Sequence, residues 1–157
     1  MEASGLGERW EDLIIETISR ILIPFLQLYS LYVLAHGHSS PGGGFQGGCI
    51  FSGSLILMMI VFGREELRRR LPDRPLFLLC ALGVGIFFAG TGALCMAFGG
   101  EFLNYGFLDA ILPRGPVMAR YYGMAIVETG VQITVMAVMV SIFLKLLVGE
   151  EGCSSNC

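Results

Sequence analysis

Glu128 is the acid best placed to do chemistry, because it lies inside an apolar stretch in the last quarter of the chain. It follows the start of a span predicted over residues 121–148, at a depth of about 10 Å along the helix axis. An acid at the centre of a bilayer costs about 3 kcal/mol on insertion scales, so this carboxylate should face protein, a partner or water. One interpretation is a group that handles a proton or a cation. The alternative is a structural acid that neighbouring helices satisfy.

Two histidines, His36 and His38, begin a polar turn over residues 36–48 that contains no residue of fixed charge. Imidazole titrates near neutrality, so one interpretation is a proton relay or a pH-sensitive gate close to Glu128. The alternative is that both rings hydrogen-bond the glycine-rich backbone and hold the turn.

Glycine permits close backbone approach and proline fixes one dihedral angle, so the turn requires a defined backbone rather than bulk. Its structural residues are Pro41, Gly42, Gly43, Gly44, Phe45, Gly47 and Gly48.

Four further polar residues lie within apolar stretches. Glu16 and Arg20 are four residues apart, which puts them on one face of a helix where they can form a charge pair. The alternative for this pair is the inner part of an ion pathway. Gln132 and Thr134 are interpreted as hydrogen-bonding residues between helices rather than as substrate ligands.

No pattern for a metal, a cofactor or catalysis stands out. The cysteines at 153 and 157 supply only two of the four ligands that a structural zinc site needs. The glycine run lacks the Gly-Lys-Ser/Thr of a phosphate loop. A nucleophile–base–acid grouping and a haem-attachment pattern are both missing from the sequence. We therefore predict no metal site, no cofactor in this chain and no enzymatic activity by the chain itself.

The composition predicts an integral membrane protein of one domain, residues 1–157. Hydrophobic residues make up 54% of the chain and charged residues 15%, whereas soluble domains usually carry about 25% charged residues. The apolar residues form four blocks long enough to cross about 30 Å of hydrocarbon as helices. The predicted all-α fold has spans at about 13–35, 45–62, 76–98 and 121–148. Residues 1–12 are expected to be a polar start and residues 150–157 a polar tail.

The loop over residues 63–74 sets the predicted orientation. It holds five of the ten basic residues, and the positive-inside rule places it in the cytoplasm of a cell-membrane protein. With four spans, both termini are then cytoplasmic, and the glycine turn and the connection 99–120 lie on the other side. We interpret the basic cluster as a topology signal, with contact to anionic lipid as the second interpretation, and not as a nucleic-acid site.

Small residues recur at intervals of four in two spans, which is typical of helices that pack closely in membranes. One strip consists of Gly44, Gly48 and Ser52 in the second span. The other is a ridge in the third span made of Ala81, Gly85, Ala89, Ala93 and Ala97.

The turn His36-Gly-His38, then Pro41-Gly-Gly-Gly44-Phe45, then Gly47-Gly48 resembles the signature of the MnhB/MrpB family, a family of small subunits of the multisubunit sodium/proton antiporters. The related subunits of membrane-bound hydrogenases and sulfane reductases share it, and the resemblance covers roughly residues 15–148. In antiporter members the turn often begins with Ala-Gly-His and the late acid is often Asp. His36 and Glu128 depart from that pattern, which leaves open whether the host complex is a stand-alone antiporter or a redox-linked one.

The resemblance implies a small helical subunit whose neighbours hold the main proton channels, with any electron carriers in other subunits. The first hypothesis is a non-catalytic membrane subunit of a complex that exchanges Na⁺ and H⁺, with other membrane subunits and the lipid bilayer as partners. The ion-pathway candidates are Glu128, His36 and His38. The second hypothesis is a purely structural adaptor. A self-standing transporter is less favoured, because four short spans leave little room for a cavity.

Overall fold

The computed structural model describes residues 2–37, 42–70, 72–97, 99–105 and 115–154. Over these residues the chain forms helices and no strand, which confirms the predicted all-α fold. The elements are α1 (Glu2–Ala35), α2 (Gly44–Phe62), α3 (Arg64–Arg70), α4 (Asp73–Leu82), the π-helical η1 (Gly83–Gly90), α5 (Thr91–Ala97) and α6 (Pro116–Ser154).

Four segments are long and apolar enough to cross a membrane, as predicted: Leu13–Ala35, Gly44–Phe62, Arg74–Ala97 and Val117–Leu147. The third and fourth begin a few residues earlier than the predicted 76 and 121. Pro75 and Pro116 lie in the first turns of α4 and α6. Proline is tolerated there because the first backbone N–H groups of a helix have no partner within it.

The two long helices reach further than the sequence indicated. α1 contains 34 residues and already begins at Glu2, where a polar start was expected. A helix of that length is about 50 Å long, so it extends well beyond about 30 Å of hydrocarbon. It also continues through Pro24. α6 runs to Ser154, across most of the segment that was expected to be a polar tail.

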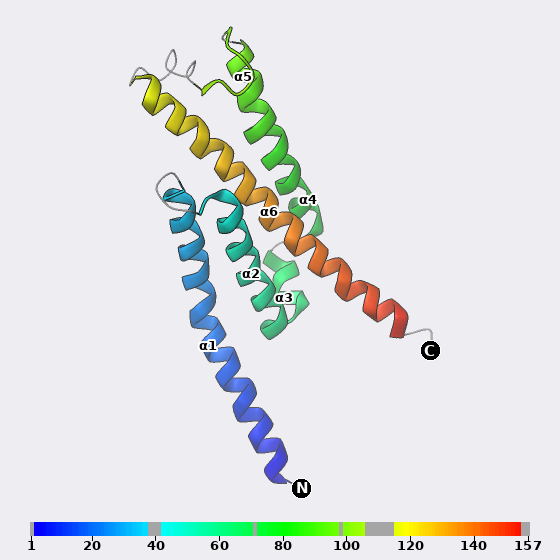
Figure 1. The fold of residues 1–157 in the computed structure, drawn as a ribbon. Helices are drawn as coiled ribbons and strands as arrows, with labels where there is room; N and C mark the ends of the chain where they lie inside the picture. The colour runs from blue at the N-terminus through cyan, green and yellow to red at the C-terminus, as the bar shows by residue number, and fades with distance from the viewer. Residues whose placement is uncertain (1, 38–41, 71, 98, 106–114, 155–157) are drawn as a thin grey trace.

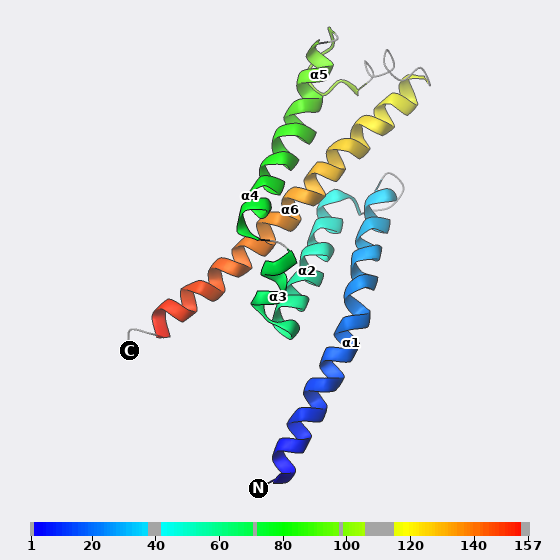
Figure 2. The same ribbon diagram turned by 180° about the vertical axis from the view of Figure 1, so that it is seen from behind.

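α6 is the central element. It crosses the molecule diagonally, with the α1–α2 hairpin on one side and the α4–η1–α5 span on the other (Figure 1). The view from behind shows the same order, with α1 separated from α4 (Figure 2). The beginning of α1, the end of α6 and α3 occupy one half of the molecule. The glycine turn and the beginning of α6 occupy the other (Figure 1).

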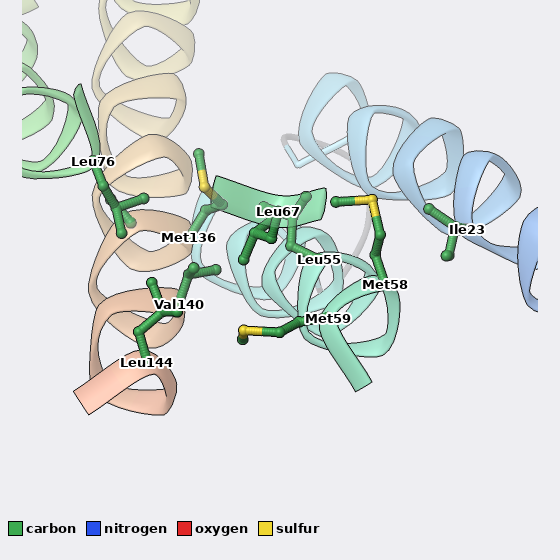
Figure 3. Packing of buried hydrophobic residues seen from close by; sticks show 10 residues of the cluster. Ile23, Leu55, Met58, Met59, Leu67, Leu76, Met136, Val140 and Leu144 are labelled. Carbon is green, nitrogen blue, oxygen red and sulfur yellow. The ribbon is translucent and has the colours of Figure 1, made fainter. Parts of the chain in front are cut away.

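The apolar core lies where α2, α3 and α6 meet. Leu67 of α3 is 1% exposed and packs beside Leu55 and Met59 of α2, while Met136 and Val140 approach from α6 (Figure 3). The segment 63–74 was interpreted from its charges as a cytoplasmic loop. It contains the short helix α3, whose one leucine, Leu67, completes the core. That position was hidden in the sequence because a single leucine among arginines shows no periodicity.

The strip of Gly44, Gly48 and Ser52 is buried at the contact between α2 and α6. A Cβ on Gly44 would run into the backbone carbonyl of Glu128. A Cβ on Gly48 would lie 2.8 Å from the Cβ of Val135 and 2.9 Å from the carbonyl oxygen of Gln132. Close helix contact at this strip was predicted, and the partner helix belongs to the same chain.

The third span packs against α6, but the face that contacts α6 is not the face that carries the small-residue ridge. Gly83 packs against Gly130 and Thr134, and the hydroxyl of Thr134 donates a hydrogen bond to the carbonyl of Gly130 within its own helix. All five residues of the ridge are exposed in the isolated chain: Ala81, Gly85, Ala89, Ala93 and Ala97. The ridge is therefore available to a helix from outside this chain.

Residues 99–105 fold back over the ends of α5 and α6. The ring of Phe102 covers Gly92, and the ring of Tyr105 covers Gly123. Burial, with a smaller contribution from Cys95, raises the pKa of the Tyr105 hydroxyl above its usual value. The connection between the third and fourth spans was predicted over 99–120. Residues 106–114 lie outside the described part of the chain, and the connection ends earlier than predicted because α6 already begins at Pro116.

Candidate functional site: Glu128 beneath the glycine turn

The carboxylate of Glu128 lies against the backbone of the glycine turn. A Cβ on Gly37 would be 2.5 Å from Glu128 Oε2, and a Cβ on Gly43 would be 3.2 Å from Oε1. The backbone carbonyl of Glu128 is in still closer contact with Gly44. Gly37 and Gly43 thus leave room for the carboxylate, and Gly44 leaves room for the backbone that carries it.

The N-terminal end of α2 contributes to the electrostatics of the contact between Glu128 and the turn. Gly43 is the residue before the first turn of α2 and has an extended backbone, with φ −148° and ψ −153°. The first N–H groups of a helix and its macrodipole put a partial positive charge at this end. The positive end of the α2 dipole therefore lies beside the Glu128 carboxylate.

Glu128 also lines a cavity of about 490 Å³ between the end of α1 and the first half of α6. Among the described residues around this cavity, Glu128 is the only one with a charged side chain, and the hydroxyls of Thr129 and Tyr121 add polar surface. The other lining residues are Leu34, Ala35, Gly37, Met124 and Ala125. A partly exposed acid at the wall of a cavity can exchange a proton with the cavity or bind a cation inside it.

His36 lies at the same end of the molecule but is turned toward its own helix. Its Nδ1 is 3.1 Å from the carbonyl oxygen of Tyr32, and its ring stacks on the ring of Tyr32 at 4.2 Å between centroids. Of the described residues of the turn, Gly37 lines the cavity and His36 does not. His38 and Pro41 lie outside the described residues.

The remaining turn residues have packing contacts. Gly42 is buried, and a Cβ there would meet Gln46 Oε1 at 2.5 Å and Val33 Cγ1 at 3.0 Å. Phe45 is 64% exposed and points away from the fold. Gly47 and Gly48 are buried and continue the close contact into α2.

A buried hydrogen-bond chain lies one helical turn further along α6, and it joins three helices. Gln132 Nε2 donates to Ser30 Oγ at 2.8 Å, and Ser30 Oγ donates to the carbonyl of Gly47, also at 2.8 Å. We call these three residues the Ser30 hydrogen-bond chain. Ser30 is 0% exposed and Gln132 is 6% exposed. The hydrogen bond of Gln132 between helices was predicted, whereas the same prediction for Thr134 is wrong, because its hydroxyl donates to Gly130 within α6. Ser30 was missed, because a lone serine in an apolar span has no pattern of its own.

Glu16 and Arg20 lie in the other half of the molecule. Arg20 Nη2 is 2.7 Å from Glu16 Oε1, and the guanidinium lies 5.6 Å from the ring centroid of Phe62. The side chain of Arg20 is 70% exposed and that of Glu16 is 46% exposed, and neither lines the cavity at Glu128. Within the described residues, no three His, Cys, Asp or Glu side chains gather as a metal site would need.

Comparison with known proteins gives consistent matches over nearly the whole chain. Residues 14–141 match the family described as "Domain related to MnhB subunit of Na+/H+ antiporter". Proteins of Staphylococcus aureus strains Newman and JH1, each named "Putative antiporter subunit mnhB2", are 34% identical over 144 residues. The match covers 89% of this chain and 97% of each of those proteins.

Proposed function

The chain belongs to the family of MnhB subunits of Na⁺/H⁺ antiporters, and we propose that it is a non-catalytic membrane subunit in which Glu128 borders the ion path. The contact that carries this proposal is that of the Glu128 carboxylate with Gly37 and Gly43 at the wall of the 490 Å³ cavity. The carboxylate lies between the glycine backbone and the open cavity, which leaves it accessible to water and cations.

The transported species would be Na⁺ or H⁺, as the name of the family suggests. Carboxylate oxygen is the ligand that hard cations prefer, and the same group can carry a proton. No lysine or arginine is among the described residues that line the cavity. Among the described lining residues, a cation therefore meets the negative charge of Glu128 and no positive charge.

Other membrane subunits would be the partners of this chain. The exposed ridge of the third span is one surface on which a helix of another subunit could pack closely. The cell membrane is the proposed location, with the α3 half and both termini in the cytoplasm. The positive-inside rule supports this orientation, because five arginines lie between Arg64 and Arg74.

The test is Glu128→Gln, which keeps the shape of the side chain and removes its charge. We expect the complex to assemble and Na⁺/H⁺ exchange to fall by about tenfold or more, because an ionisable group in a span is seldom dispensable. Assembly is measured by co-purification with the partner subunits, and exchange by the Na⁺-induced change of pH in everted vesicles.

Glu101→Gln is the matched control, since Glu101 is an exposed acid in the same half of the molecule but outside the cavity. It should leave exchange unchanged. If Glu128→Gln exchanges ions at the normal rate, or if it fails to assemble, Glu128 is a structural acid and the proposal is wrong.

A further inference from the structure

A second cavity lies in the α3 half of the molecule and has a volume of about 640 Å³. Its walls come from α1, α2 and α3, and they combine charged, amide and apolar side chains. The lining residues are Arg20, Ile23, Pro24, Gln27, Met58, Phe62 and Glu66. We call it the inner cavity and the one at Glu128 the outer cavity.

The two cavities follow one face of α1. On α1, the last described residue that lines the inner cavity is Gln27, and the first that lines the outer cavity is Leu34. Seven residues separate these two positions, which is two helical turns or about 10 Å. Ser30 falls between them on the same face, three residues after Gln27 and four before Leu34.

The Ser30 hydrogen-bond chain occupies this interval. Ser30 is 0% exposed, and its hydroxyl is held between the amide of Gln132 and the carbonyl of Gly47. A Cβ on Gly47 would be in tight contact, 3.1 Å from the carbonyl oxygen of Ser30 and 3.2 Å from Gln132 Nε2. The seam between the cavities is thus closed by polar groups in direct contact.

The stretch between the two cavities also has a polar residue on the side of α2. Ser54 follows Gly47 by seven residues and precedes Met58 of the inner cavity by four, so it shares their helix face. It is 0% exposed. An apolar seal would repel water, whereas hydroxyl, amide and carbonyl oxygens can coordinate a small hard cation or hydrogen-bond water once they separate.

We propose that the Ser30 hydrogen-bond chain is the closed barrier of a path for water and a small cation, running along α1 between the two cavities. This proposal rests on the function proposed for Glu128, since the path ends at that carboxylate. Arg20 does not present an uncompensated positive charge at the inner end, because Glu16 pairs with it at 2.7 Å. Glu66 is the one acid among the described residues of the cavity wall.

The test is the reactivity of single cysteines toward a charged, membrane-impermeant thiosulfonate, measured in the assembled complex with the native cysteines replaced by alanine. Gln27→Cys should react only from the α3 side, and Ala35→Cys only from the side of the glycine turn. Leu28→Cys is the matched control. Leu28 neighbours Gln27 but lies on the exposed apolar face, and it should react from neither side.

The barrier itself is tested with two variants of Ser30. Ser30→Cys, the milder change, should react about tenfold more slowly than cysteine at 27 or 35 from either side, because a buried thiol is inert. Ser30→Ala removes the shared hydroxyl and should make Gln27→Cys reactive from both sides.

The proposal is overturned if Gln27→Cys reacts from neither side, because the inner cavity then holds no water. It is also overturned if Ser30→Cys reacts as fast as the cavity positions, or if Ser30→Ala assembles and leaves labelling one-sided. This readout requires no transport, so it separates failure of the barrier from failure of Glu128. Normal exchange in Glu128→Gln with the labelling pattern above would refute only the function of the acid.

Discussion

At the scale of the residue, the molecule is organised by glycines that make room for one carboxylate. Gly37 and Gly43 approach the side chain of Glu128, and Gly44 approaches its backbone. These contacts differ in how far the neighbour can yield. A carboxylate can rotate away from an added methyl group, whereas a helix backbone cannot. Substitutions at Gly37 and Gly44 should therefore separate function from folding.

Gly37→Ala should impair ion exchange and leave assembly intact. The new Cβ would lie 2.5 Å from Glu128 Oε2, so the carboxylate must shift within its cavity. We expect exchange to fall several-fold and the Na⁺ concentration for half-maximal activity to change, both measured in everted vesicles. Gly53→Ala is the control, because nothing lies within 4 Å of a Cβ at that position. Exchange kinetics equal to the unmodified chain would show that the turn does not position the acid.

At the scale of the element, α6 is held from two sides by glycine contacts. Gly44 and Gly48 bring α2 against it, and Gly83 with Gly130 brings the third span against it. Lipid tails offer no hydrophobic drive for helix association, so close packing and buried hydrogen bonds provide the attraction. The Ser30 hydrogen-bond chain adds the third helix, α1, to the α2–α6 pair.

Gly44→Ala should destabilise the chain, because the added Cβ would overlap the backbone carbonyl of Glu128. Overpacking of this kind costs about 3 kcal/mol when neither backbone can move. The expected result is a lower melting temperature in detergent and loss of the assembled complex. Gly53→Ala in the same helix should leave both unchanged. A normal melting temperature for Gly44→Ala would mean that α2 and α6 do not pack closely at Gly44.

At the scale of the whole molecule, the four helices form an open array rather than a closed bundle. Only 17% to 39% of the residues in each span are buried within the chain. α1 contacts mainly α2, and its apolar outer face, which includes Ile21, Phe25 and Leu28, is exposed. Most of the surface must therefore meet lipid or other subunits, as expected of a component of a larger membrane complex.

Both termini should lie on the same side of the membrane as α3, in the cytoplasm. The reason is the excess of arginine between Arg64 and Arg74. Fluorescent-protein fusions to either end should fluoresce, and Glu101→Cys, in the exposed opposite loop, should be labelled by an impermeant reagent in intact cells. Labelling of Glu101→Cys only after the membrane is permeabilised would reverse the orientation.

The sequence alone determined the class of fold, the number of spans and the pairing strip on α2. Apolar blocks of spanning length and a period of four in small residues are local signals, and they follow directly from the thickness of a bilayer and the pitch of a helix. Glu128 also stood out from sequence, since an acid inside an apolar block is costly wherever it packs. The family signature lay in the turn, because close backbone approach requires glycine at fixed positions.

The tertiary structure decided which of these residues meet. It brought Gly37 and Gly43 to Glu128 and turned His36 toward Tyr32. Which of these side chains meet depends on the rotation of each helix about its axis, and the composition carries no information on that rotation. It also showed Ser30 between Gln132 and Gly47, and Leu67 in the core. A single buried serine or leucine has no periodicity, so only the contact between helices distant in sequence reveals its role.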